Sequence, residues 1–261
     1  MRVFSFALLL GLLAAPVDAQ TIWSRPYVPN QLAIEAVVPD TPDDAAALSG
    51  ATFLSGTFSL NSNVEVAAEL PVARYATTNG TSTTALGNPY VGIGFSSTTI
   101  PMLVQIGARI PTAPSNAATR IGESADMGRL SAFRHDELVL SGLLNGRFAI
   151  GRNTTLRVRT GLGYASFPTP TSPDGRDRDW RTYYDAQIWR EGNRFLTGVS
   201  VTGRATLTNP RSTEHHAALS LMVNWRRVQP GLVVGTAIND LVQNSTFTPF
   251  AGLTLSVNYL Q

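Results

Sequence analysis

The chain has 261 residues, of which 43% are hydrophobic, and its 20 basic and 18 acidic side chains give a formal net charge of +2. This near balance gives no reason to expect a nucleic-acid partner. The absence of cysteine excludes a disulfide framework and any metal or redox chemistry that depends on cysteine. With 22 Gly and 16 Pro, the composition suits one all-β domain.

Residues 1–19 have the pattern of a secretory signal peptide. Arg2 supplies the positive start, residues 4–15 are apolar, and Val17 to Ala19 provide the small-residue cleavage site. The apolar stretch is shorter than the roughly 20 residues of a spanning helix. We therefore expect residues 20–30 to form a periplasmic lead-in and residues 31–261 to form the mature domain.

The mature domain alternates apolar and polar residues in segments about ten residues long, which is the period of a β-strand with one oily and one wet face. The clearest case is the hairpin 87–111, in which Val91, Ile93 and Phe95 share one face and only four residues separate the two arms. Twelve such segments are predicted, near 31–38, 50–60, 64–75, 87–95, 100–111, 137–148, 155–165, 180–190, 194–206, 215–225, 231–239 and 248–259.

Strands of this length cross a bilayer when they are tilted, and only a closed barrel satisfies their backbone hydrogen bonds there. Short connections after the even-numbered strands and longer ones after most odd-numbered strands are typical of outer-membrane barrels with short periplasmic turns and longer extracellular loops. The sequence thus predicts a single antiparallel transmembrane β-barrel of about twelve strands in the outer membrane. The Thr-rich segment 76–86, the charged segment 166–179 and the longest connection, 112–136, are expected as loops, and the last of these is the best candidate for a partial plug.

Ten charged side chains fall on the polar face of the predicted strands and are expected to line the lumen: Glu35, Glu65, Glu69, Arg109, Arg147, Arg157, Arg159, Arg181, Asp185 and Arg204. The glutamates lie on the first and third strands, and most of the arginines lie on the sixth to ninth, so the two signs are expected on opposite walls. One interpretation is that arginine and carboxylate pairs only satisfy polar groups in a narrow interior. The other is a transverse field that selects solutes by charge.

The three histidines, His135, His215 and His216, show no metal-ligand spacing, and no cofactor is expected. A barrel hydrolase would need a nucleophile beside a histidine. His216 has Glu214 nearby but no nucleophile in its sequence context, so no catalytic residue is predicted.

Four stretches resemble the outer-membrane family named for the MetA pathway of phenol degradation: SLNSNVEVAAELPVARY (59–75), GNPYVGIGF (87–95), PMLVQIGARIPT (101–112) and RVQPGLVVG (227–235). The resemblance covers most of residues 31–261. It implies a transporter barrel for small, often hydrophobic compounds, and it offers no catalytic residues to carry over.

We therefore expect a porin-like outer-membrane barrel that lets small compounds, hydrophobic or aromatic ones included, pass through its lumen. The expected partners are outer-membrane lipid, lipopolysaccharide, a small-molecule solute and the barrel-assembly machinery. The alternatives are a non-conducting structural or surface-binding barrel and, less favoured, an outer-membrane hydrolase.

Overall fold

The computed structural model describes residues 30–40, 49–97, 101–126, 129–169, 175–208, 213–225, 227–238 and 248–259. The predicted signal peptide and all of the lead-in except Asn30 lie outside the described residues. No helix in the described part of the chain is long and apolar enough to cross a membrane.

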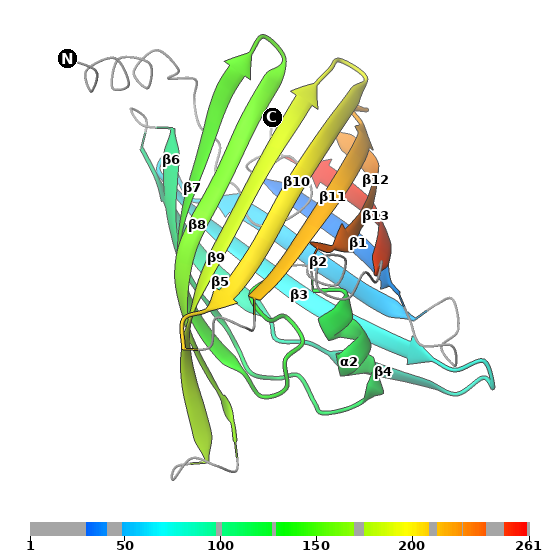
Figure 1. Ribbon diagram of the computed structural model, residues 1–261. Helices are drawn as coiled ribbons and strands as arrows, with labels where there is room; N and C mark the ends of the chain where they lie inside the picture. Colours follow the sequence, from blue (N-terminus) through cyan, green and yellow to red (C-terminus); the bar gives the residue numbers. More distant parts are fainter. Residues whose placement is uncertain are drawn as a thin grey trace.

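Within these residues, thirteen strands occupy the twelve positions of one closed antiparallel barrel, because β4 and β5 share one position, and this confirms the predicted fold (Figure 1). The ring closes where β1 pairs with both β2 and β13, so that Glu35 lies opposite Phe53 on one side and Thr254 on the other. The elements are β1 (Gln31–Pro39), β2 (Gly50–Ser59), β3 (Val64–Ala76), β4 (Ser82–Leu86), β5 (Tyr90–Ser96), β6 (Met102–Arg109), α2 (Ala117–Ser124), β7 (Leu138–Gly151), β8 (Thr154–Pro168), β9 (Arg176–Glu191), β10 (Phe195–Thr206), β11 (Thr213–Val223), β12 (Val228–Ala237) and β13 (Pro249–Asn258).

The two ends of the barrel differ in the length of their connections, as predicted. The connections 60–63, 97–101, 152–153, 192–194 and 224–227 are short and meet at one end, here named the turn end. The connections after β1, β3, β6, β8, β10 and β12 meet at the other end, here named the loop end, and the one between β6 and β7 is the longest. Helix α2 belongs to it and lies at the loop end (Figure 1).

The outer surface of the barrel is apolar because the predicted alternation holds along the strands. Side chains such as Ile106, Leu219 and Leu253 are 57%, 58% and 66% exposed on the outside. Exposed aromatic rings flank this belt: Trp225 lies at the turn end and Trp180 near the loop end. An apolar band with aromatic residues towards both ends is the outer surface expected of a transmembrane barrel.

One predicted loop is partly wrong, because residues 82–86 form β4. This short strand pairs with the far end of β3, and β5 pairs with the near end, so β4 and β5 together form one barrel position. Pro89, which has no N–H, lies in the break between them, and Asn88 uses its side chain to hold the β6–β7 connection. The alternation rule missed β4 because its Ser and Thr residues carry no apolar face.

The predicted loop 166–179 is also too long. Strand β8 continues to Pro168 and β9 begins at Arg176, so the two strands pair beyond the barrel rim (Figure 1). Residues 176–179 are all charged, which is compatible with a strand that has left the bilayer but gives no apolar periodicity to detect.

Candidate functional site

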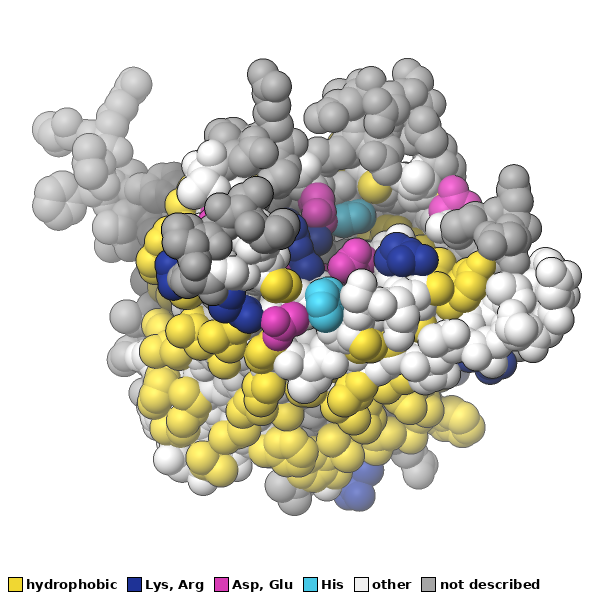
Figure 2. All heavy atoms as spheres, turned by 90° about the horizontal axis from the view of Figure 1, so that it is seen from below, with side chains coloured by type: hydrophobic (Ala, Val, Ile, Leu, Met, Phe, Trp, Pro, Cys, Tyr) yellow, Lys and Arg dark blue, Asp and Glu magenta, His cyan; other side chains and the backbone are white. Residues whose placement is uncertain are grey.

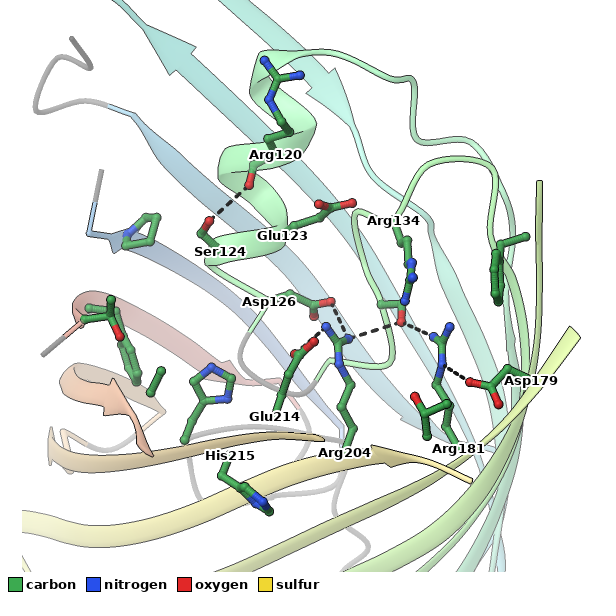
Figure 3. A pocket seen from close by; sticks show the side chains of 18 of the residues that line it. Arg120, Glu123, Ser124, Asp126, Arg134, Asp179, Arg181, Arg204, Glu214 and His215 are labelled. Atoms are coloured by element: carbon green, nitrogen blue, oxygen red, sulfur yellow. Dashed lines mark hydrogen bonds and ion pairs between the residues drawn. The ribbon is translucent and has the colours of Figure 1, made fainter. Parts of the chain in front are cut away.

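The barrel is hollow at its loop end, where a cavity of about 1060 Å³ opens between the inner wall and the β6–β7 connection. Inward-facing side chains of β9 to β13 form one side, and α2 with the residues after it forms the other (Figure 3). Seen from this end, charged side chains and histidine surround the hollow, and apolar side chains cover the barrel wall outside it (Figure 2). The lining carries charges of both signs, so the cavity suits a polar or partly polar solute.

The β6–β7 connection folds into the barrel as the sequence suggested. We name its described part, residues 110–126 and 129–137, the plug. Helix α2 was not predicted; its start is fixed by Asn116, whose side-chain oxygen accepts a hydrogen bond from the Thr119 N–H at 2.9 Å. Ala118 and Phe133 are fully buried, and the Phe133 ring meets the Phe53 ring of β2 edge-on, with the ring centroids 5.7 Å apart. The plug is thus packed as part of the core.

A buried ionic network, here named the latch, fixes the plug to the wall. Arg129 of the plug lies 2.5 Å from Glu35 of β1 and 3.2 Å from Glu69 of β3. Glu69 also accepts a hydrogen bond from Arg109 of β6 at 2.6 Å, and all four side chains are at most 3% exposed. The Arg129 guanidinium carbon lies 3.6 Å from the centroid of the Phe53 ring. Two carboxylates and two guanidinium groups balance in charge, which is what permits such deep burial.

Asn88 and Arg109 hold the backbone at the base of the plug. The Asn88 side-chain oxygen accepts hydrogen bonds from the backbone N–H groups of Thr112 and Ala113, both at 2.9 Å, and its amide donates to the Arg134 carbonyl at 2.7 Å. Arg109 donates to the carbonyl of Arg129 at 2.8 Å and to that of Asn88 at 2.7 Å. These bonds fix both arms of the plug to the break between β4 and β5.

Two arginines of the opposite wall reach the plug from the floor of the cavity (Figure 3). Arg181 of β9 and Arg204 of β10 both donate to the Ser131 hydroxyl, at 2.9 and 3.2 Å. Arg181 is also paired with Glu137, and Arg204 lies 2.6 Å from Glu214 of β11. Neither arginine is an uncompensated positive charge.

Asp126 closes the turn of the plug that carries Arg129. Its two oxygens accept hydrogen bonds from the backbone N–H groups of Arg129 at 3.0 Å and Ala132 at 2.9 Å, and Arg204 lies 3.4 Å away. Burial raises the pKa of Asp126 to about 6, although Arg204, Arg109 and Arg129 act against the shift. Burial likewise raises the pKa of Glu123 on α2. The plug therefore carries one carboxyl group, Asp126, that takes up a proton in mildly acidic solution, and a second, Glu123, whose pKa is shifted in the same direction.

Three more of the predicted arginines lie nearer the turn end. Arg147 of β7 and Arg157 of β8 share Glu191 of β9, each at 3.1 Å. Arg159 donates to Asn145 at 2.8 Å and lies opposite Asp185 in the β8–β9 register. Arg157 and Arg159 thus face carboxylates on the neighbouring strand β9, and Arg147 reaches across β8 to the carboxylate of Glu191.

The remaining predicted residue, Glu65, is 6% exposed and lies on the inner face of β3, opposite Gly94 of β5. A Cβ at Gly94 would come within 2.8 Å of Glu65. The absence of a side chain at that position makes room for the carboxylate.

All ten predicted lumen residues thus lie inside the barrel, but they do not form two opposed walls of unlike charge. Glu35, Glu69 and Arg109 meet in the latch, Arg157, Arg181 and Arg204 pair with acids on an adjacent strand or the plug, Arg147 shares Glu191 with Arg157 across β8, and Arg159 lies opposite Asp185. Sequence reasoning missed the partners Arg129, Asp126, Glu137, Glu191 and Glu214. Glu191 and Glu214 lie on or beside a predicted strand and could have been found from the register, whereas the plug residues carry no periodic signal.

The histidines lie in three different surroundings. His135 contacts the Ala113 carbonyl through Nδ1 at 2.9 Å, His215 is hydrogen-bonded to the Tyr184 hydroxyl, and His216 packs edge-on against Phe250. Among the described residues, no three His, Asp or Glu side chains are grouped as metal ligands would be.

An apolar groove of about 640 Å³ lies at the loop end beside the cavity. Outward-facing residues such as Val199, Leu219 and Val234 line it, and Phe250 and Pro39 belong to both the groove and the cavity. The two hollows are therefore neighbours across the wall formed by β1, β12 and β13.

No profile of a known protein family matches the sequence, and no curated protein matches it. Solved structures are similar in fold. An outer membrane channel from Pseudomonas putida F1 has a TM-score of 0.57 at 10% identity, covering 92% of this chain and 99% of that one. The NanC porin has a TM-score of 0.56 at 10% identity over 87% of this chain and 98% of that one, and the KdgM porin 0.54 at 8% over 88% and 99%. This chain has the fold of outer-membrane β-barrel channels.

Proposed function

We propose that this protein is an outer-membrane channel of the transporter family named for the MetA pathway of phenol degradation, and that small compounds, hydrophobic or aromatic ones included, pass through its lumen. The observation that carries the proposal is the charged cavity at the loop end, enclosed by a barrel whose outer surface is an apolar belt. Two porins and an outer membrane channel have similar folds, which supports it. The apolar groove beside the cavity supports the hydrophobic part of the proposed solute range.

The same proposal places the protein in the outer membrane after removal of residues 1–19, with lipid along the belt and lipopolysaccharide around the loop end. The barrel-assembly machinery would insert it. The lumen-facing charges would set which solutes pass. Fractionation of cells producing the full chain, together with the mass of the mature protein, tests the location and the cleavage site.

Liposome swelling with the purified protein tests the passage itself. We expect swelling with small sugars or amino acids that is lost as solute size increases, and transfer of small aromatic compounds into protein-containing vesicles faster than into empty ones. A folded barrel, recognised by heat-modifiable migration on a gel, that transfers neither class would favour a structural or surface-binding role.

A hydrolase is the weaker alternative. His135 and His215 contact a carbonyl and a phenol rather than a serine, and the carboxylate of Glu214 is engaged by Arg204. Turnover of lipid or peptide that is lost on His216→Ala would revive this alternative.

A further inference from the structure

The tip of the plug completes an apolar layer inside the barrel. Leu130 packs with Ala67 of β3, Tyr90 of β5, Leu143 of β7 and Tyr183 of β9, and each of these five side chains is at most 3% exposed. The cavity with Asp126 and Arg204 lies on the loop-end side of this layer, and the cluster of Arg147, Arg157 and Glu191 lies towards the turn end. Leu130 thus contributes to an apolar layer between two charged regions of the lumen.

The backbone at this tip is held in an unfavourable conformation. Leu130 and Ser131 have φ angles of +54° and +61°, in the left-handed region that residues other than glycine rarely adopt. Such conformations persist only where the surroundings impose them, and they concentrate at switch regions. Here the latch holds Arg129 on one side, and Arg181 and Arg204 hold Ser131 on the other.

We propose that Leu130 is the gate of the lumen and that the latch, through the ion pairs of Arg129 with Glu35 and Glu69, keeps this gate closed. The inference rests on the proposed channel function. When the latch opens, the plug tip relaxes from its left-handed conformation and leaves the apolar layer. Its departure joins the cavity at the loop end to the charged region around Arg157 and Glu191. The residues that control passage are then on the plug, and the arginines of the opposite wall act on solutes only after the gate has opened.

The latch is suited to this role because its parts come from different elements. Glu35, Glu69 and Arg109 belong to β1, β3 and β6 of the wall, and Arg129 is the only latch residue on the plug. Glu69 keeps Arg109 as a partner when Arg129 leaves, so the wall retains an ion pair in the open state. Opening therefore breaks contacts between plug and wall without leaving Glu69 unpaired.

The experiment uses thiol labelling, because the chain has no cysteine of its own. Leu130→Cys introduces one thiol at the tip, and Ser124→Cys, at an exposed plug position, gives a reference rate. The protein is placed in lipid vesicles and treated with a membrane-impermeant methanethiosulfonate. We expect the Leu130→Cys thiol to react slowly relative to the reference.

Glu69→Gln and, separately, Arg129→Gln are then combined with Leu130→Cys. Each should raise the labelling rate at the tip by about tenfold or more, since a buried ion pair that loses one partner is strongly destabilised. Swelling by either latch variant should exceed that of the parent. Arg129→Gln leaves the Glu69–Arg109 pair of the wall intact, so it keeps the test valid if Glu69→Gln does not fold. The matched control is Asp136→Asn, which removes the half-exposed ion pair of the plug with Arg176 and should leave the tip protected.

Three results overturn the gate. They are rapid labelling of the tip in the parent, unchanged labelling in both folded latch variants, and labelling that rises without any increase in swelling. Labelling reports movement of the plug whether or not solutes pass, and swelling by the parent reports passage. A parent that passes solutes with a permanently protected tip would refute the gate and leave the channel standing.

Discussion

The buried carboxyl of Asp126 makes the plug sensitive to pH, and the sign of the effect follows from its surroundings. Its pKa is about 6 in the plugged barrel, against an ordinary value of 3.8 once the plug is in water. A carboxyl with a raised pKa is protonated more readily in the plugged state, so protons stabilise that state. The stabilisation is greatest below the ordinary value and is lost as the pH rises through about 6.

The size of the effect can be worked out from the two pKa values. Between pH 7.5 and pH 4.5 the linkage amounts to about 2 kcal/mol, which is about a 25-fold change in the ratio of open to plugged barrels. The groups that face the carboxyl are Arg204 of β10, Arg109 of β6, Glu214 of β11 and the neighbouring Arg129. The raised pKa of Glu123 on α2 acts in the same direction. Acid should therefore close the channel.

Planar-bilayer recording gives the assay, with the open fraction of single channels measured from pH 7.5 to 4.5 in concentrated KCl. High salt screens the direct effect of charge on ion flow, because the Debye length falls to about 3 Å at 1 M. The Asp126→Asn variant has no carboxyl to titrate and should lose most of the response, whereas Glu123→Gln should keep most of it. An open fraction that rises on acidification, or an Asp126→Asn channel with the full response, would refute the reasoning.

Three further predictions concern stability and selectivity. Glu69→Gln removes a buried anion that pairs with Arg109 and Arg129, and it should lower the free energy of unfolding by about 3–5 kcal/mol. Asp136→Asn removes a half-exposed ion pair and should lower it by about 1 kcal/mol or less. Urea unfolding in detergent, followed by tryptophan fluorescence, measures both. Gly107→Ala places a Cβ that overlaps the Tyr90 hydroxyl and should cost about 1–3 kcal/mol by the same assay, while Gly142→Ala meets nothing within 4 Å and should be nearly neutral. Replacing Arg157 and Arg159 together by Gln should move the reversal potential in a salt gradient towards cations, and an unchanged potential would mean that these charges only satisfy the network with Glu191 and Asn145.

The barrel could be predicted from sequence because each strand carries its own signal. Lipid requires apolar side chains at every second position, so Val91, Ile93 and Phe95 reveal both the strand and its outer face without knowledge of any partner. Strand segments outside the bilayer do not need apolar side chains at every second position, so they carry no such signal. Strand β4 and the start of β9 lie near or beyond the rim, where Ser, Thr and charged residues suffice, so the sequence pattern predicts loops there.

The latch could be predicted only in part, for a related reason. Glu35, Glu69 and Arg109 were placed in the lumen by alternation, but alternation gives a side chain its face and not its partner. Their common neighbour Arg129 comes from a segment with no period, and it is 94 residues from Glu35 in the chain. The short helix α2 has an Asn cap at residue 116, yet its eight residues are too few to separate a helical period from chance.

The number of strands explains why this barrel needs a plug. The interior width of a barrel grows with its strand number: about eight strands leave room that side chains can fill, and sixteen leave an aqueous channel. In this twelve-stranded barrel, Leu130 of the plug packs in one buried cluster with the inward side chains Ala67 and Tyr183, and Arg129 of the plug pairs with Glu35 and is the second partner of Glu69. Leu130 and Phe133 of the plug fill space inside the barrel that the wall side chains leave open. Arg129 of the plug adds a positive charge beside Glu35 and Glu69. A single segment that completes the packing and the charge balance is also the segment whose removal opens the lumen, so the same contacts that stabilise the barrel are placed to control it.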